Sequence, residues 1–262
     1  MIVRDFMTPD PVTAAPETSI HDALASMEHH GVRHLPVVLS GKMVGVVSDR
    51  DLVGQAGTSF YTGGGGKIPK ETRIEEVMKK DVITANPMDP VVAVAVELSA
   101  QGIGCLPVLE DGKLVGIVSE TDLLRLVSEL KDGPQVVTQS IGAMGAGVAV
   151  TANLEATVKQ LDELMSAKGI RHVPITSDGQ VVGMVSDRDM RRAGWTGLHG
   201  TASAGEIMSK GVISVPATDT VQQAARTMSE RRISALVTES GEGTFGIVTS
   251  TDLLEFALGA LQ

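Results

Sequence analysis

Apolar residues along the chain follow two different spacings, which predict helices and strands in turn. One run has the spacing of a helix face that packs on a core: Val158, Leu161, Leu164 and Met165. Residues 34–39 and 43–48 are short runs rich in branched residues, and Ser40-Gly41-Lys42 joins them, which predicts a hairpin. A short strand is expected before the helix, at Val12-Thr13 or Val82-Ile83-Thr84, and a second helix after the hairpin. The predicted unit is therefore β-α-β-β-α, an α+β element.

The same unit occurs four times along the chain. Each copy closes on an apolar strand, a hydroxyl residue and, three residues later, an aspartate: Gly45–Asp51, Gly116–Asp122, Gly183–Asp189 and Gly246–Asp252. No insertion falls between the first hydroxyl residue of a copy and this aspartate, which indicates duplication of one supersecondary unit. We expect repeats at residues 1–56, 73–130, 141–194 and 205–262.

The copies also differ with a period of two. The odd copies carry Arg33-His34 and Arg171-His172 before the hairpin, whereas the even copies carry Gly104-Cys105 and Ser234-Ala235 at those positions. This alternation predicts two modules of two repeats each, residues 1–130 and 135–262.

Composition and charge exclude several functions. The formal net charge of −10 disfavours binding to a nucleic-acid backbone, which requires a surplus of Lys and Arg. The longest wholly apolar stretch is Val91–Val96, far below the roughly 20 residues of a membrane span, so no membrane insertion is expected. A single cysteine, Cys105, expected to be a small buried residue, and an N-terminus without an apolar signal segment predict a cytoplasmic protein.

The hydroxyl residue and the aspartate that close each copy have two alternative interpretations. Ser/Thr three residues before an acid is a capping box, which stabilises a helix start by roughly 0.5–2 kcal/mol. The pair also suits a ribose-phosphate, because amides at a helix start attract phosphate and a carboxylate accepts hydrogen bonds from ribose hydroxyls. Recurrence in four copies favours the ligand, with one or two sites occupied rather than all four.

At these motifs the sequence resembles the CBS domain family (cystathionine β-synthase domains) over nearly its whole length. The resemblance rests on the Ser/Thr-x-x-Asp endings, on Gly-Val-Arg-His-Leu-Pro-Val at residues 31–37, and on the preceding threonine. It implies units that pair through their sheets into Bateman modules, which stack in twos into a flat disc. The arrangement is similar to the gamma subunit of AMP-activated protein kinase. The family's clefts bind adenosine ligands, namely AMP, ADP, ATP or S-adenosylmethionine.

The resemblance also implies which side chains meet the nucleotide. The ribose carboxylates would be Asp51, Asp122, Asp189 and Asp252, and the phosphate-side hydroxyls Ser48, Ser119, Ser186 and Thr249. The hydroxyls near the adenine would be Thr13, Thr84, Thr151 and Ser214. The phosphates would meet Arg33, His34, Arg50, Thr121, Arg171, His172, Arg188 and Thr251, with Ser234 at the corresponding place in copy four. Because the even copies lack the Arg-His pair, we expect the odd copies to bind phosphate more tightly.

These observations predict a regulatory, adenosine-nucleotide-binding protein that acts on an unknown effector protein in trans. Catalysis is not expected, because the chain has no Gly-x-Ser-x-Gly, Ser-x-x-Lys or His-Glu-x-x-His motif. The alternatives are a ligand-free interaction scaffold and an S-adenosylmethionine sensor. The cluster His29-His30-x3-His34 is not expected to bind a metal, and Gly63–Lys67 is expected to be a linker rather than a phosphate-binding loop.

Apolar helices after the even copies predict self-association into a dimer. The residues concerned are Leu123, Leu124, Leu126, Val127 and Leu130 after copy two, and Leu253, Leu254, Phe256, Leu258 and Leu261 after copy four. A short exposed helix would leave too much of this surface in water. The alternative is that stacking within the chain buries much of it.

Overall fold

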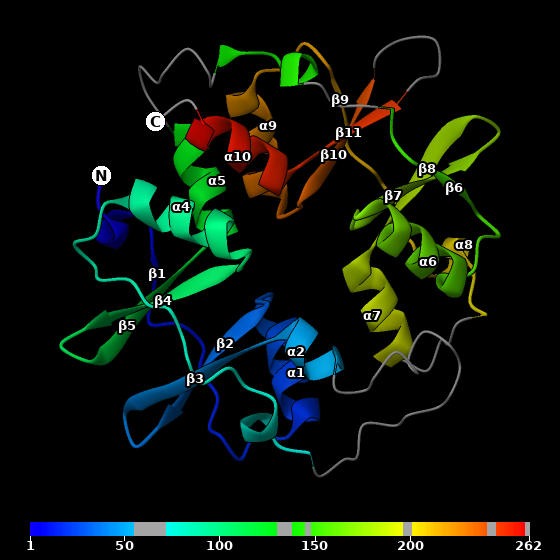
Figure 1. Ribbon diagram of the computed structural model, residues 1–262. Helices are drawn as coiled ribbons and strands as arrows, with labels where there is room; N and C mark the ends of the chain where they lie inside the picture. Colours follow the sequence, from blue (N-terminus) through cyan, green and yellow to red (C-terminus); the bar gives the residue numbers. More distant parts are fainter. Residues whose placement is uncertain (55–71, 130–137, 145–147, 196–200, 240–244, 260–262) are drawn as a thin grey trace. The chain divides into compact units, whose positions relative to one another are not determined.

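The structure is a computed structural model that describes residues 1–54, 72–129, 138–144, 148–195, 201–239 and 245–259 (Figure 1). The chain divides into two compact units, the first ending at Val127 and the second beginning at Ser128. Each unit contains two of the four repeats. The segment Gly63–Lys67, predicted to be a linker, lies outside the described residues.

Unit 1 contains repeats 1 and 2. Repeat 1 consists of η1 (Val3–Asp5), β1 (Thr8–Pro9), α1 (Ile20–His30), β2 (His34–Leu39), β3 (Lys42–Ser48) and α2 (Asp49–Gly54). Repeat 2 consists of η2 (Ile74–Glu76), α4 (Val91–Gln101), β4 (Cys105–Glu110), β5 (Lys113–Ser119) and α5 (Glu120–Glu129). The predicted order of helix, hairpin and helix is confirmed in both repeats, and Figure 1 shows the two hairpins of the unit beside each other.

Unit 2 repeats this organisation. Repeat 3 consists of η4 (Ile141–Met144), β6 (Ala152–Asn153), α6 (Val158–Lys168), β7 (His172–Ser177), β8 (Gln180–Ser186) and α7 (Asp187–Trp195). Repeat 4 consists of α8 (Ala204–Ile207), β9 (Ser214–Pro216), α9 (Val221–Arg231), β10 (Ala235–Glu239), β11 (Phe245–Thr249) and α10 (Ser250–Gly259). The predicted α+β class is thereby confirmed.

Local sequence explains where the first helix of each repeat begins and ends. Ser19, Thr157 and Thr220 cap α1, α6 and α9 by accepting a hydrogen bond from a backbone amide three residues later. The helices α1, α4 and α6 each end on a glycine in the left-handed conformation. The corresponding helix of repeat 4, α9, ends instead on Arg232, with a φ of 54°. A left-handed arginine costs more than a glycine, so packing must hold this end of repeat 4.

The strand predicted before the first helix is much shorter than expected in unit 1. It is reduced to single bridges, Ala14 with Val37 and Ala85 with Val108. In repeat 1 the Ala14 amide donates to the Pro36 carbonyl, and the Val38 amide donates to the Ala14 carbonyl. The next donor in this parallel ladder would be Pro16, which has no N–H, so the pairing stops. In unit 2 the equivalent segments are the strands β6 and β9, which pair in parallel with β7 and β10.

Within each unit, the segment at the start of one repeat packs on the other repeat. We call these the exchanged segments: residues 2–9, 73–79, 140–144 with 148–149, and 203–209. In unit 1, Thr8 of β1 pairs with Ile117 of β5, and Lys79 bridges Val46 of β3. In unit 2, Ser209 bridges Met184 of β8, and Val148 bridges Gly246 of β11. The exchange ties the two repeats of a unit into one structure.

The exchanged segments also explain the strand glycine that precedes the closing hydroxyl residue in repeats 1, 2 and 3. A Cβ added at Gly45 would lie 2.8 Å from the sulfur of Met78, and one at Gly116 would lie 2.5 Å from the sulfur of Met7. Gly183 faces Met208 in the same way. The glycines therefore make room for a methionine from the neighbouring repeat, a requirement that one repeat does not reveal.

The apolar helices expected to form a dimer surface are buried within the single chain. Leu123, Leu124, Leu126 and Val127 of α5 and Leu253 and Leu254 of α10 are at most 8% exposed. Leu130 and Leu261, and the side chain of Leu258, lie outside the described residues. Burial of these described residues favours the alternative, that packing within the chain covers them, and the dimer stays a prediction. Among the described residues, no helix combines the length and apolar character needed to cross a bilayer.

Candidate functional site

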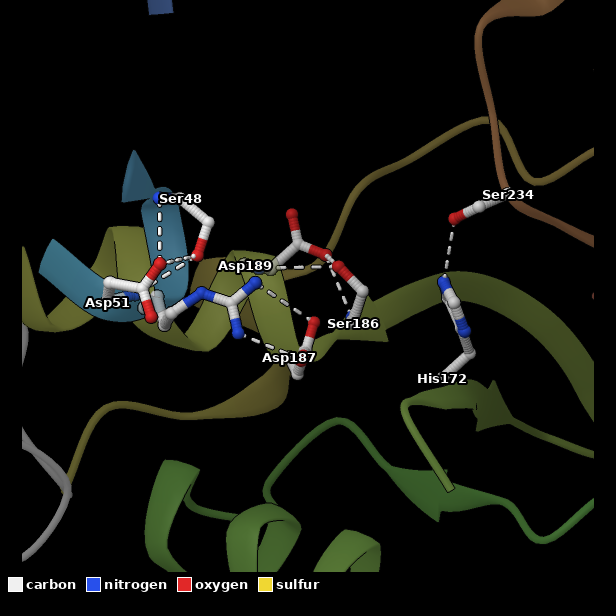
Figure 2. A network of polar contacts seen from close by, with 8 residues as sticks. Ser48, Asp51, His172, Ser186, Asp187, Asp189 and Ser234 are labelled. Atoms are coloured by element: carbon white, nitrogen blue, oxygen red, sulfur yellow. Dashed lines mark hydrogen bonds and ion pairs between the residues drawn. The ribbon is translucent and has the colours of Figure 1, made fainter. Parts of the chain in front are cut away.

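The hydroxyl residue and the aspartate of each Ser/Thr-x-x-Asp motif contact each other in all four repeats. Asp51 Oδ2 accepts hydrogen bonds from the backbone amide of Ser48 at 2.8 Å and from its hydroxyl at 2.6 Å. The pairs Ser119–Asp122, Ser186–Asp189 and Thr249–Asp252 have the same two contacts, at 2.5 to 2.9 Å. Figure 2 shows two of these pairs, Ser48–Asp51 and Ser186–Asp189. The capping interpretation is therefore correct for one carboxylate oxygen, and the other oxygen, Oδ1, can serve a second purpose.

In two repeats Oδ1 accepts a hydrogen bond from an exchanged segment. Thr8 Oγ1 donates to Asp122 Oδ1 at 3.3 Å, and Ser209 Oγ donates to Asp189 Oδ1 at 3.3 Å. No single repeat reveals these two hydroxyls, because each comes from the start of the other repeat in its unit. A signal for them exists in the sequence, since Thr8 and Ser209 each follow a methionine and stand five residues before Thr13 and Ser214.

The four carboxylates differ in their exposure. Asp122 is buried, with 7% exposed surface, beneath Thr8 and near Arg125. Asp51 and Asp189 are half-buried, and Asp252 is exposed. The sites are therefore not equivalent, although their sequence motif is the same.

The upstream hydroxyls lie on the exposed side of each repeat. Thr13, Thr84, Thr151 and Ser214 are all exposed, at or next to the short parallel pairing with the first hairpin strand. Their hydroxyls are thus accessible to a ligand beside the sheet.

The arginines before the hairpins of the odd repeats reach the neighbouring repeat. Arg33 Nη2 lies 3.7 Å from Glu120 Oε2, in the first turn of α5. Arg171 Nη2 donates to Thr251 Oγ1 at 3.1 Å, in the first turn of α10. We expected each guanidinium to serve its own repeat; the structure places it at the closing helix of the even repeat. The side chains within the closing helices, Arg50, Arg188 and Thr121, are exposed.

The histidine that follows Arg33 is a neutral spacer between repeats 1 and 2. A Cβ added at Gly104 would lie 2.8 Å from the His34 ring, so the ring fills the space that a side chain there would occupy. Burial, followed by the positive charge of Arg33, lowers the pKa of His34 to about 4. At neutral pH His34 therefore offers a hydrogen-bonding ring and no charge for a phosphate.

The equivalent histidine of unit 2 makes a polar contact with repeat 4. His172 Nε2 and Ser234 Oγ lie 3.0 Å apart, as Figure 2 shows. Ser234 occupies the place of Gly104, so a hydroxyl replaces the glycine that admits the ring in unit 1. The change from Gly104 in repeat 2 to Ser234 in repeat 4 therefore changes the contact between the two repeats of a unit, from ring packing to a hydrogen bond.

Two other expectations concern the single cysteine and the histidine cluster at residues 29–34. Cys105 is buried, as predicted for a small apolar residue, and burial raises its pKa to about 12. Among the described residues, no group of three or more His, Cys, Asp or Glu side chains is placed to hold a metal ion. His30 of the histidine cluster instead contacts the Ser26 carbonyl through Nδ1 at 2.9 Å.

Several known proteins have sequences similar to this chain. The protein MJ1225 of Methanocaldococcus jannaschii is 33% identical over 130 residues, which are 47% of this chain and 46% of that protein. A 33.4 kDa protein from a ribosomal RNA operon of Thermofilum pendens is 28% identical over 93% of this chain and 87% of its own length. The chain spans less than half the length of the first curated relatives that it matches.

Solved structures extend the likeness to the fold. The crystal structure of MJ1225, described as a candidate archaeal homologue of g-AMPK, matches with a TM-score of 0.78 at 22% identity, covering 98% of this chain and 99% of that one. A CBS domain pair of the M. jannaschii protein MJ0100, crystallised with 5'-methylthioadenosine and S-adenosyl-L-methionine, is 33% identical. That likeness covers 48% of this chain and 94% of that one, with a TM-score of 0.42.

The family assignment follows from the four repeats themselves. The CBS domain matches residues 3–56, 74–129, 148–195 and 204–259. These ranges contain all four Ser/Thr-x-x-Asp motifs and both hairpins of each unit. The chain therefore belongs to the CBS domain family, whose members are regulatory ligand-binding modules.

Proposed function

We propose that this chain senses an adenosine nucleotide and transmits its bound state to a partner protein in trans, without catalysis of its own. The observation that carries the proposal is the arrangement of the repeat carboxylates. In each repeat one carboxylate oxygen is held by the neighbouring hydroxyl and amide, which orients the second oxygen. In repeats 2 and 3 this second oxygen also accepts a 3.3 Å hydrogen bond from Thr8 or Ser209. An oriented carboxylate oxygen is a suitable acceptor for a ribose hydroxyl.

Further side chains support a nucleotide in preference to a bare phosphate or a bare nucleoside. The exposed hydroxyls Thr13, Thr84, Thr151 and Ser214 lie beside the sheet, where they can meet a base. The guanidinium of Arg171 lies at the closing helix α10, where it can meet an anion. A net charge of −10 repels anions at long range, so this local positive charge is needed for a phosphate to bind.

Thermal unfolding of the full chain with adenosine, AMP, ATP and S-adenosylmethionine tests the proposal. A ligand at 100 times its dissociation constant stabilises the folded state by about 2.7 kcal/mol, which is a clear shift in melting temperature. We expect a shift with at least one of the four compounds and none with GMP at the same concentration. A chain that none of them stabilises would be the ligand-free scaffold, and stabilisation by S-adenosylmethionine alone would identify the alternative sensor.

A further inference from the structure

The residue that follows the closing hydroxyl residue differs among the repeats in a way that concerns phosphate. It is Asp49 in repeat 1, Glu120 in repeat 2, Asp187 in repeat 3 and Ser250 in repeat 4. A carboxylate in this first turn repels a phosphate that approaches the adjacent hydroxyl, whereas a serine does not. Repeat 4 is therefore the repeat whose motif presents no carboxylate at this position.

Arg33 and Arg171, which both reach the closing helix of the neighbouring repeat, have different partners there: a carboxylate for Arg33 and a hydroxyl for Arg171. Arg33 lies 3.7 Å from the Glu120 carboxylate, so an internal anion compensates its charge. Arg171 donates instead to the neutral hydroxyl of Thr251 at 3.1 Å, and no carboxylate of the described residues forms an ion pair with it. Arg171 is exposed, so an anion from solution can reach it.

The aspartates of the two even repeats also differ in a way that makes repeat 4 more accessible to a ligand than repeat 2. Asp122 of repeat 2 is buried beneath Thr8, whereas Asp252 of repeat 4 is exposed. Repeat 4 thus combines an accessible ribose acceptor with an uncompensated guanidinium. Repeat 2 combines a covered acceptor with a guanidinium that Glu120 already neutralises.

We propose that the site of repeat 4, formed by Arg171, Thr249, Thr251 and Asp252, selects adenosine ligands that carry a phosphate. Glu120 acts as a built-in competitor that makes the equivalent site of repeat 2 reject phosphate. The inference rests on the proposed function and adds which repeat is specific for the phosphate. It replaces the expectation that the odd repeats prefer phosphate, because the odd-repeat arginines lie at the even-repeat helices.

Isothermal titration of the full chain with adenosine and with AMP tests repeat 4 through a matched pair of variants. Arg171→Gln and Arg33→Gln remove the same group from the same motif position. We expect Arg171→Gln to weaken AMP on the order of tenfold and adenosine by less than twofold, because only AMP gains from the guanidinium. Arg33→Gln should leave the ratio of the two affinities unchanged. Equal loss of AMP affinity in both variants, or in Arg33→Gln alone, would overturn the assignment to repeat 4.

A second pair of variants tests the role of Glu120. Glu120→Gln keeps the shape of the side chain and releases Arg33, so AMP binding outside repeat 4 should strengthen on the order of tenfold. Glu129→Gln removes the same charge from the other end of α5, where the side chain is exposed, and should change nothing. An unchanged AMP titration with Glu120→Gln would overturn the competitor role. If neither adenosine nor AMP bound the wild-type chain, the proposed nucleotide-sensing function itself would be wrong. If both bound but the variants did not behave as expected, only the assignment of phosphate selectivity to repeat 4 would be wrong.

Discussion

At the residue scale, each repeat aspartate serves two needs with its two oxygens. Oδ2 completes the capping box of the closing helix, and Oδ1 is available to a partner, which is an internal hydroxyl in repeats 2 and 3. Helix capping and ligand binding are thus compatible roles for the same side chain. A variant at this position should therefore lose both stability and ligand affinity. A matched variant that removes a helix cap but no ligand contact is needed to separate the two effects.

Asp189→Ala should lower both stability and affinity. Losing the cap should cost about 0.5–2 kcal/mol of unfolding free energy, and losing the ribose acceptor should weaken an adenosine ligand. Thr157→Ala is the matched control, since it removes the capping box of α6 in the same repeat. Urea unfolding and calorimetric titration of both variants should show equal destabilisation but weakened binding only for Asp189→Ala. Equal affinities would leave the carboxylate with a capping role alone.

Asp51→Ala and Ser19→Ala form the same comparison in repeat 1. Ser19 caps α1 by accepting from the Asp22 amide at 3.1 Å, so its loss should destabilise the unit without touching the ligand. We expect weaker AMP binding for Asp51→Ala and wild-type affinity for Ser19→Ala, measured by titration at a temperature where both are folded. Weakened binding in Ser19→Ala would attribute the effect to stability.

His34 should make unit 1 sensitive to acid. Its pKa in the folded state, about 4, lies below the ordinary value of 6.5, so the unfolded chain binds the proton more readily between these values. The stability that neutral His34 contributes is fully present above pH 6.5 and is lost as the pH falls through about 4. Urea midpoints at pH 7.5, 5.5 and 4.5 should therefore fall less steeply in His34→Gln than in wild type. His29→Gln, at an exposed position, should retain the wild-type slope.

At the element scale, the exchanged segments join the repeats of each unit. Each segment begins with a short helical turn that places one fully buried side chain against the neighbouring repeat: Val3, Ile74, Ile141 and Ala204. A methionine then fills the space left by a strand glycine in unit 1 and in repeat 3. The hairpins of unit 1 therefore depend on distant residues: Met78 lies 33 positions after Gly45, and Met7 lies 109 positions before Gly116.

Gly116→Ala should destabilise unit 1 through Met7. The new methyl group would overlap the methionine sulfur, and overpacking of this kind costs about 1–3 kcal/mol. Met7→Ala alone should also destabilise, by loss of packing, but the double variant should be more stable than the sum of the single effects implies. Additive effects in this double-mutant cycle, measured by urea unfolding, would show that the two residues do not contact each other.

At the scale of the whole molecule, the buried leucines of α5 and α10 change the expected assembly. Leu126 is 8% exposed in a single chain, so it belongs to the interior and not to a dimer surface. The oligomeric state stays a prediction without this surface.

Leu126→Glu should unfold the chain rather than dissociate a dimer. Burying a carboxylate among apolar side chains costs several kcal/mol, so the melting temperature should fall strongly. Light scattering should give the same molar mass for the wild type and for any folded fraction of the variant. A stable Leu126→Glu chain with half the wild-type mass would restore the dimer through this helix.

The repeated unit, its helices and hairpins, and the capping pairs can all be predicted from the sequence, because they depend on residues close together in the chain. Four copies at constant spacing made the family evident, and the Ser/Thr-x-x-Asp motif specified which side chains contact each other within each repeat. Even the early stop of the first strand can be read from Pro16 and Pro87. Local hydrogen bonding and periodicity carry this information.

The contacts between the two repeats of a unit, in contrast, appear only once the chain is folded. The pairing of Arg33 with Glu120, the contact of Arg171 with Thr251 and the donation from Thr8 to Asp122 all join residues that no fixed spacing relates. The same holds for the space at Gly116 and for the burial that keeps His34 neutral. Charge and exposure depend on which groups meet in space, and the two repeats of a unit meet through their hairpins and closing helices as well as through the exchanged segments.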